Sequence, residues 1–441
     1  MVGDNTFVVV ANRLPVDRVQ GRWVPSPGGL VAALEPVLQA QQGCWVGWPG
    51  EPDAVMEPFE HAGVRLHPVR LSTSDYAEFY EGFSNATLWP LFHDLIVHPV
   101  FELSWWQRYQ QVNEKFAVEA ARVAAPGATV WVQDYQLMLV PGLLRRLRPD
   151  VTIGFFLHIP FPAPDLFRQL PWRDELLDGL AGADLVGFQR DRDEANFKAL
   201  GGSSISTGTF PISIDPSHFG PVSADRVSTI RRALGGPRTM MLGVDRLDYT
   251  KGILQRLLAV EELLEAGELE DVSVVQIATP SRERIDHYRQ TRAAVEQAVG
   301  RINGRFGKIG TPVVHYCHRP LGKAQLREYY AAADVMLVTP FKDGMNLVAK
   351  EYVACHPEGD GALVLSEFAG AASELSAAHL CNPFDGESVK SAIRSAVAGR
   401  GTPAGRDAMR EMNMQVNENT VAVWAESFLR RLDKSGAGRG V

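Results

Sequence analysis

The feature that most constrains the fold is a series of short, apolar, β-branched runs that recur along the chain and end near Gly, Pro, Asn or Asp. Such runs are typical of strands that a parallel sheet buries on both faces. They lie at residues 7–11, 129–132, 153–157, 185–188, 239–244, 272–277, 313–316, 335–338 and 363–365. Helix-like stretches separate many of them, at residues 113–124, 137–147, 253–266, 284–299 and 324–333. This alternation predicts an α/β fold built from doubly wound parallel sheets.

The length of 441 residues and one extended segment predict more than one domain. Residues 210–216 contain two prolines, and each proline disfavours helix at the residue before it. Because a fresh series of strands follows this segment, we expect an amino-terminal domain at 1–210 and a carboxy-terminal domain at 211–419. We expect a last helix within 420–441 to cross back onto the first domain, before a Gly-rich tail that frays.

Composition excludes several classes of protein. Forty-four Lys and Arg face 52 Asp and Glu, a net charge of −8, which is the wrong sign for a protein whose whole surface binds nucleic acid. The N-terminus lacks a basic start, and no apolar run approaches the length of a membrane span, so we expect neither a signal peptide nor a membrane partner. Cys44, Cys317, Cys355 and Cys381 stand singly, without zinc spacing. These features predict a soluble, reduced, cytoplasmic protein that uses no metal and no cofactor.

Two features near the N-terminus could face an anion. Gly28 and Gly29 feed the Ala-rich stretch 30–34, and backbone N–H groups at such a helix start can approach a phosphate closely. A simple helix-entry turn is the alternative. Arg13 follows the first predicted strand, at the carboxyl edge where open α/β sheets bind ligands. An arginine in that position is otherwise usually a solvated loop residue.

Two further strand–turn–helix segments carry charge. Residues 243–252 place Arg246 and Lys251 just after a strand, as a diphosphate site requires. The alternative is a surface ion pair of arginine with Asp245 or Asp248. Residues 339–351 follow another strand. A helix that starts near Asn346 would aim its free N–H groups at the same edge, and Glu351 would project about a turn and a half further on. That glutamate could accept hydrogen bonds from ribose, or could simply pair with a lysine on its helix.

A third group of residues has the chemistry of a carbohydrate pocket. Tyr80 and Trp89 flank an aromatic, polar segment, and Asp134 and His158 each follow a predicted strand. Aromatic faces, a carboxylate and a hydrogen-bonding histidine suit sugar hydroxyls, but a lone Trp or His is more often structural. The triplet 191–193, Asp-Arg-Asp, matches a metal-binding pattern, yet it opens a predicted helix. Helix capping and the helix dipole explain it better.

Together these segments resemble the trehalose-6-phosphate synthase family of retaining glycosyltransferases. The resemblance implies the GT-B architecture, in which two Rossmann-like domains face a central cleft. It rests on residues 12–15, 27–30, 83–90, 154–162, 246–252, 300–307 and 343–351, which follow the family's order over roughly residues 7–385. The chain departs from the family at residues 201–210, where members generally carry a longer, strand-containing excursion.

The resemblance implies roles for individual residues. Those of the donor site are Arg246 and Lys251 for the diphosphate, Glu351 for the ribose, Gly28 and Gly29 for the phosphate-facing turn, and Asp343, Gly344, Met345, Asn346, Leu347 and His158 for the glucose and its phosphate. Those of the acceptor site are Arg13, Tyr80, Trp89 and Arg282 for the phosphate and Asp134 for the sugar. Arg246, Lys251, His158 and Asp343 would lie nearest the chemistry.

The resemblance also implies the reaction: glucose passes from UDP- or GDP-glucose to glucose 6-phosphate, giving α,α-trehalose 6-phosphate and a nucleoside diphosphate. Three alternatives stay open, namely a glucosylglycerol-phosphate synthase, a pseudo-glycosyltransferase that joins cyclitols, and a non-catalytic sensor of nucleotide sugars. The base of the donor, which could be UDP, GDP or ADP, and assembly into homo-oligomers stay open as well.

Overall fold

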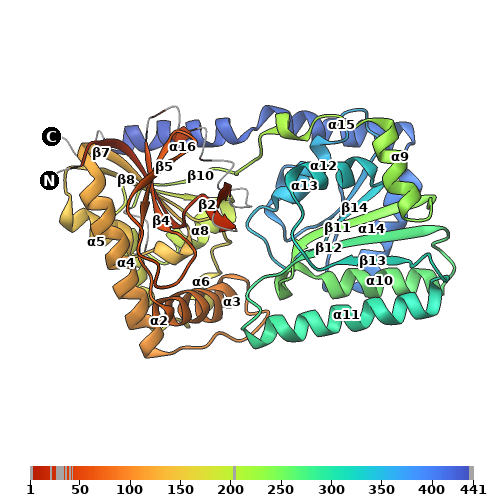
Figure 1. Cartoon of the computed structure of the whole chain (residues 1–441), viewed down its shortest axis with the longest axis horizontal. Coiled ribbons are helices and arrows are strands. Elements are labelled where there is room, and N and C mark those ends of the chain that lie inside the picture. Colours follow the sequence, from red (N-terminus) through yellow and green to blue (C-terminus); the bar gives the residue numbers. More distant parts are fainter. Residues whose placement is uncertain are drawn as a thin grey trace. The chain divides into compact units, whose positions relative to one another are not determined.

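The computed structural model describes residues 3–19, 22–25, 34, 37, 38, 41, 43–201 and 205–436. The chain divides into two compact units, one of Met1–Ile212 with Val421–Val441 and one of Ser213–Thr420. Each unit contains a largely parallel sheet with helices packed on it (Figure 1). The predicted α/β fold class is therefore confirmed.

The first unit has a sheet with the strand order β10-β9-β8-β7-β1-β4-β6-β5. β5 pairs antiparallel with β6, and the other neighbours in this order are parallel. Its strands are β1 (Asn5–Arg13), β4 (Cys44–Trp48), β5 (Phe59–His61), β6 (Val64–Pro68), β7 (Ala124–Gln133), β8 (Thr152–Phe156), β9 (Leu185–Phe188) and β10 (Thr207–Thr209), and β2 (Val16–Val19) forms a separate hairpin with β3 (Arg22–Pro25). Its helices are α2 (Thr73–Asp75), the π-helix η1 (Tyr76–Leu88), α3 (Trp89–Phe92), α4 (Leu103–Val123), η2 (Tyr135–Leu137), α5 (Val140–Leu147), α6 (Pro164–Phe167), α7 (Arg173–Leu180), α8 (Asp191–Lys198) and α16 (Val421–Gly436).

The second unit has a parallel sheet with the order β13-β12-β11-β14-β15-β16. Helices α10, α11 and α14 pack together on one face, and α9, α12, α13 and α15 pack on the other (Figure 1). The strands are β11 (Thr239–Arg246), β12 (Val272–Thr279), β13 (Val314–Cys317), β14 (Val335–Val338), β15 (Ala362–Ser366) and β16 (His379–Cys381). The helices are η4 (Pro216–Phe219), α9 (Ala224–Ala233), η5 (Tyr249–Lys251), α10 (Ile253–Glu265), α11 (Asp286–Phe306), α12 (Lys323–Ala332), α13 (Leu347–Ala354), η6 (Gly370–Ser373), α14 (Gly386–Gly399) and α15 (Pro403–Glu418).

In each unit the chain reverses its direction of travel across the sheet. In the first unit it runs from β1 through β4 to β6, and then resumes at β7 on the other side of β1. In the second it runs from β11 through β12 to β13, and then resumes at β14 on the other side of β11. Open α/β sheets bind ligands outside the carboxyl ends of the strands at such a reversal. The two topologies therefore mark the β1–β7 edge and the β11–β14 edge.

The predicted strands and helices overlap observed elements, except for the helix predicted at 30–34, of which only residue 34 lies within the described part. The patterns failed where apolar runs are interrupted. Strand β4 is buried throughout but contains Gly47 and two tryptophans, and η1 was predicted only as an aromatic segment. In the shortened segment that departs from the family, residues 202–204 lie outside the described part, and β10 nevertheless pairs with β9.

The last helix, α16, packs on strands β8 and β9 of the first unit. The Phe428 ring stacks on Trp131, with ring centroids 4.6 Å apart. Gly154 in β8 and Gly187 in β9 make room for this ring, because a Cβ atom there would lie 2.8 Å and 2.7 Å from it. The sequence of the first unit is thus shaped to receive a helix that comes more than two hundred residues later.

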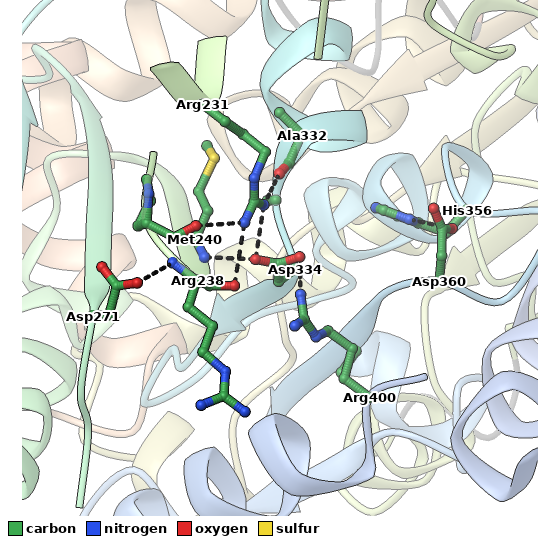
Figure 2. Close-up of polar contacts among 12 residues, drawn as sticks. Arg231, Arg238, Met240, Asp271, Ala332, Asp334, His356, Asp360 and Arg400 are labelled. Atoms are coloured by element: carbon green, nitrogen blue, oxygen red, sulfur yellow. Dashed lines mark hydrogen bonds and ion pairs between the residues drawn. The ribbon is translucent and has the colours of Figure 1, made fainter. Parts of the chain in front are cut away.

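The amino edge of the second sheet is closed by a cluster of charges (Figure 2). The Asp334 carboxylate accepts hydrogen bonds from Arg231 Nη1 at 2.8 Å and from the Met240 N–H at 2.7 Å, and it also pairs with Arg400. Arg231 donates as well to the carbonyl oxygen of Ala332. One carboxylate thereby ties α9, β11 and the end of α14 together at the edge opposite to the predicted site.

We predict that Phe428→Ala lowers the free energy of unfolding by about 3–5 kcal/mol, because it removes a buried ring that packs against Gly154 of β8 and Gly187 of β9. Urea denaturation followed by circular dichroism measures the change. The control is Val423→Ala, on the exposed side of the same helix, where the change should stay within about 0.5 kcal/mol. Equal effects of the two substitutions would contradict this packing.

Candidate active site

The predicted donor residues of the second unit gather at the β11–β14 edge. Arg246 is the last residue of β11, η5 ends at Lys251, and Asp343 follows β14. The Lys251 ammonium lies 2.6 Å from Asp343 Oδ2, and the two side chains are only 11% and 16% exposed. Asn346 Nδ2 donates to the same carboxylate oxygen at 3.1 Å. The structure therefore joins three predicted donor residues, Lys251, Asp343 and Asn346, in one contact network.

Helix α13 begins where the sequence predicted. Asn346 is its N-cap, and the Asn346 side-chain oxygen accepts the Ala349 N–H at 3.1 Å. The loop before it is supported by η6, since the Gly370 and Ala371 N–H groups donate to the carbonyl oxygens of Asp343 and Met345. A Cβ atom on Gly370 would lie 1.9 Å from the carbonyl oxygen of Gly344, so only glycine permits this approach.

Glu351 projects from α13, one turn beyond its start. Glu351 Oε2 accepts a hydrogen bond from the buried Tyr330 hydroxyl at 2.8 Å. Burial raises the pKa of Glu351 above its usual value. The alternative of a solvated glutamate paired with lysine on its own helix is therefore wrong. Tyr330, which orients this carboxyl group, was missed because its only sequence signal was a place in a predicted helix.

A buried arginine, which the sequence analysis missed, stabilises the turn from Arg246 to Lys251 through hydrogen bonds. Arg256 is fully buried in α10. Its guanidinium donates to Asp245 Oδ2 at 2.7 Å, to Thr339 Oγ1 at 2.9 Å and to the carbonyl oxygen of Lys251 at 2.9 Å. Asp245, one of the aspartates weighed as a partner for Arg246, thus pairs with Arg256. A charge on the apolar side of a predicted helix was the signal that could have revealed it.

Arg282 belongs to the second unit, whereas the other residues predicted for the acceptor phosphate belong to the first. It follows β12, and its side chain is 3% exposed. Arg282 Nη1 lies 3.3 Å from Asp248 Oδ2 and contacts the Tyr288 hydroxyl. Asp248, the second aspartate weighed as a partner for Arg246, therefore pairs with Arg282.

In the first unit, Arg13 and Tyr80 lie at the two ends of one aromatic row. Arg13 ends β1, pairs with Asp17, and places its guanidinium 5.0 Å from the centre of the Trp48 ring. Trp48 packs on Tyr76 and Tyr76 on Tyr80, each with centroids 5.3 Å apart. Beside Arg13 is an open pocket of about 490 Å³, lined by Arg13, Asp17, Arg18, Pro49, Gly50 and Glu51.

Asp134 and His158 meet at the carboxyl ends of the neighbouring strands β7 and β8, as predicted from their positions after strands. Asp134 Oδ1 accepts the His158 N–H at 3.1 Å. His158 Nε2 lies 2.9 Å from Gln133 Oε1, so Gln133, the last residue of β7, orients the ring. Burial lowers the pKa of His158 to about 3, and the imidazole is therefore neutral at physiological pH. Gln133 was missed, although it directly precedes Asp134.

Trp89 lies in the core of the first unit. It is 4% exposed, and its ring packs on His93 at 4.1 Å and on Tyr135 at 5.6 Å between centroids. The Tyr135 hydroxyl donates to Asn85 Oδ1 at 2.8 Å, and Asn85 Nδ2 donates to the Tyr80 carbonyl oxygen at 2.7 Å. Trp89 and Tyr80 are thus joined through Tyr135, the neighbour of Asp134.

Three predicted site residues are among the eight described non-glycine residues with positive φ. Asp134, Arg282 and Asn346 have φ angles of 73°, 48° and 82°. Positive φ is uncommon outside glycine, and such residues cluster at active sites, where surrounding contacts hold them.

The remaining predictions concern metals, membranes and the glycine turn. Within the described ranges no group of three or more His, Cys, Asp or Glu side chains could hold a metal ion. Asp193 pairs with Arg190 at the start of α8, where the helix dipole favours it, but Arg190 and not an aspartate is the N-cap. In the part of the chain that the structure describes, no helix is long and apolar enough to cross a membrane. Gly28 and Gly29 lie outside the described residues.

Comparison with known proteins gives consistent matches along the chain. The family model described as glycosyltransferase family 20 matches residues 5–434. A trehalose-6-phosphate synthase from Mycolicibacterium smegmatis is 52% identical over 471 aligned positions, which cover 98% of this chain and 93% of the relative. A UDP-forming α,α-trehalose-phosphate synthase from Burkholderia xenovorans, solved in complex with glucose-6-phosphate, superposes with a TM-score of 0.86 at 33% identity and covers 97% of this chain and 100% of its own. A structure from E. coli described as trehalose-6-phosphate bound with UDP-2-fluoro glucose has a TM-score of 0.87 at 33% identity and covers 97% and 98%. This chain belongs to glycosyltransferase family 20.

Proposed function

We propose that this chain is a retaining glucosyltransferase that moves glucose from UDP-glucose to glucose 6-phosphate and forms α,α-trehalose 6-phosphate and UDP. The observation that carries the proposal is the meeting of Lys251 and Asp343 beside the end of β11, in a chain 52% identical over nearly its whole length to a trehalose-6-phosphate synthase. The related structures with glucose-6-phosphate and with UDP-2-fluoro glucose support these two substrates.

The second unit would bind most of the donor. Arg246 and Lys251 meet the diphosphate, and Glu351, oriented by Tyr330, accepts hydrogen bonds from the ribose. Asp343 and the backbone of residues 344–347 take the glucose hydroxyls and the adjoining phosphate. The resemblance assigns His158 of the first unit to the donor glucose, and it assigns Gly28 and Gly29, which lie outside the described residues, to the donor phosphate.

The first unit would supply most of the acceptor site. Arg13 and Tyr80, at the ends of the aromatic row, bind the acceptor phosphate, and Trp89 supports them from the core. Asp134 accepts hydrogen bonds from the acceptor sugar. The resemblance assigns Arg282 of the second unit to the acceptor phosphate as well. Residues 1–210 thus act chiefly as an acceptor domain and residues 211–419 as a donor domain.

The chemistry follows from where charge develops. As the bond to the diphosphate breaks, positive charge grows on the sugar carbon and negative charge grows on the leaving group. Arg246 and Lys251 bind the leaving group more strongly as its charge grows, which stabilises the transition state over the ground state. The departing diphosphate takes the proton of the attacking acceptor hydroxyl on the same face of the sugar. A neutral His158 can hydrogen-bond the glucose without placing a second positive charge beside the oxocarbenium-like carbon.

We also assign a cellular compartment. The four cysteines are free thiols, which suits a reducing compartment, and we place the enzyme in the cytoplasm. The rival acceptors and the sensor function lead to different outcomes in the assay that follows.

We predict that purified protein with glucose 6-phosphate and UDP-glucose releases UDP and forms an α,α-1,1-linked disaccharide phosphate, identified by mass spectrometry and NMR. GDP- and ADP-glucose run in parallel define the donor base. Nucleotide release only with glycerol 3-phosphate or a phosphorylated cyclitol would reassign the product, and donor binding without turnover would favour the sensor.

Arg246→Ala should lower kcat by at least about a hundredfold, the scale of losing one preorganised charge partner of the transition state. Steady-state kinetics measures this loss. Arg232→Ala, a matched change on the exposed side of α9, should leave kcat within twofold. Near-normal turnover of a folded Arg246→Ala protein would refute the assignment.

His158 gives a prediction about pH. Its pKa is about 3 in the folded protein and near 6.5 when unfolded, so the unfolded chain binds more protons between these values. Stability therefore falls as the pH is lowered below 6.5. Between pH 6.5 and 5.5 the free energy of unfolding of the wild type should fall by about 1 kcal/mol more than that of His158→Asn. Urea titrations at the two pH values test this, and parallel losses would mean that the ring already titrates normally.

A further inference from the structure

One buried carboxylate lies among the three cations that we assign to phosphate groups. Asp248 stands in the donor loop between Arg246 and Lys251, and its side chain is fully buried. Burial alone would raise the pKa of this carboxyl group, but the positive charges of Arg282, Arg246 and Lys251 outweigh burial and hold the pKa below its usual value. Asp248 is therefore an anion at neutral pH, and it feels cations of both the donor set and the acceptor set.

The two oxygens of Asp248 have different partners. Asp248 Oδ1 accepts the N–H of Thr250 at 2.9 Å, which caps the short helix η5 that ends at Lys251. Asp248 Oδ2 lies 3.3 Å from Arg282 Nη1 and accepts a hydrogen bond from the Tyr288 hydroxyl at 3.1 Å. One oxygen thus shapes the donor loop, and the other holds the acceptor arginine.

Arg282 depends on such a partner for its position. Its backbone has a φ of 48°, in the left-handed region that non-glycine residues adopt infrequently. Its guanidinium is almost completely buried and lies 5.5 Å from the centre of the Tyr288 ring. A buried cation is costly unless it is paired and hydrogen-bonded. Strand order makes the pairing with Asp248 feasible, since β11 and β12 are parallel neighbours whose carboxyl ends lie side by side.

We propose that Asp248 is a positioning residue that sets Arg282 for the acceptor phosphate and couples it to the loop that binds the donor diphosphate. The inference rests on the function proposed above. Arg246, Lys251 and Arg282 repel one another because all three are positively charged. The buried Asp248 carboxylate offsets that repulsion with its negative charge. In this role Asp248 touches no substrate and acts through Arg282.

The substitution Asp248→Asn separates the capping of η5 from the pairing with Arg282. The amide oxygen of asparagine can still accept the Thr250 N–H and keep the cap of η5, whereas the charge that holds Arg282 is lost. Calorimetric titration of glucose 6-phosphate into the UDP-saturated protein should show binding about tenfold weaker than in the wild type. The affinity for UDP itself should change by less than about threefold.

A double-mutant cycle distinguishes positioning from a general structural role. Arg282→Ala alone should weaken glucose 6-phosphate binding by about tenfold or more, as loss of a charge-assisted contact does. In the Arg282→Ala background, Asp248→Asn should add less than about twofold. The matched control is Asp385→Asn, which makes the same change at the N-cap of α14, where Asp385 accepts the Glu387 N–H, and it should leave both affinities unchanged.

The outcomes are distinct. Losses that add in the cycle, or an equal loss of UDP affinity, would overturn the positioning role while leaving the proposed function intact. A wild-type protein that binds no glucose 6-phosphate beside UDP would overturn the proposed function and this inference with it. Should Asp248→Asn fail to fold by circular dichroism, Tyr288→Phe carries the test. It removes only the hydroxyl between Asp248 and Arg282, and it should weaken binding about threefold, with no further loss when Arg282 is already alanine.

Discussion

Cations that bind a diphosphate at the edge of a sheet must be dehydrated enough to act strongly, yet they repel one another when they are brought together. In the second unit several buried or partly buried cations near the β11–β14 edge lie against carboxylates. Lys251 pairs with Asp343, Arg256 pairs with Asp245, and Asp248 lies against a further arginine. Breaking a buried pair leaves an uncompensated charge, so these carboxylates constrain how the turns after β11 and β14 can fold.

The two edges of this sheet use charge differently. At the amino edge the Asp334 carboxylate pairs with Arg231 and Arg400, and its contacts tie helices and strands together within the unit. At the carboxyl edge the charged groups stand on short turns and at the start of α13, where backbone N–H groups and the helix dipole also favour anions. The amino edge thus stabilises the fold, and the carboxyl edge is left to bind a ligand.

The candidate site of the first unit has more aromatic and uncharged groups, with Arg13 at one end of its row of rings. Its site contains a row of packed rings and a histidine that burial keeps uncharged. Gln133 and Asp134 hold that histidine through one side-chain contact and one backbone contact. Rings and neutral hydrogen-bonding groups suit a sugar, whereas paired cations suit a diphosphate, and this contrast supports the roles that we propose for the two units.

Much of this could be predicted from the sequence, because strand patterns, helix starts and motif residues are local features of the chain. The buried runs predicted β1, β7, β8 and β9 of the first sheet and β11 to β15 of the second, and Asn346 marked the start of α13. The strands β4, β5, β6, β10 and β16 were not predicted. The sequence alone could not predict which side chains would meet. Asp248 and Arg282 are 34 residues apart and touch because β12 lies beside β11, and Tyr330 reaches Glu351 because α12 packs against α13. Such contacts depend on strand order and helix packing, which are decided only when the whole sheet assembles and distant charges must find partners away from water.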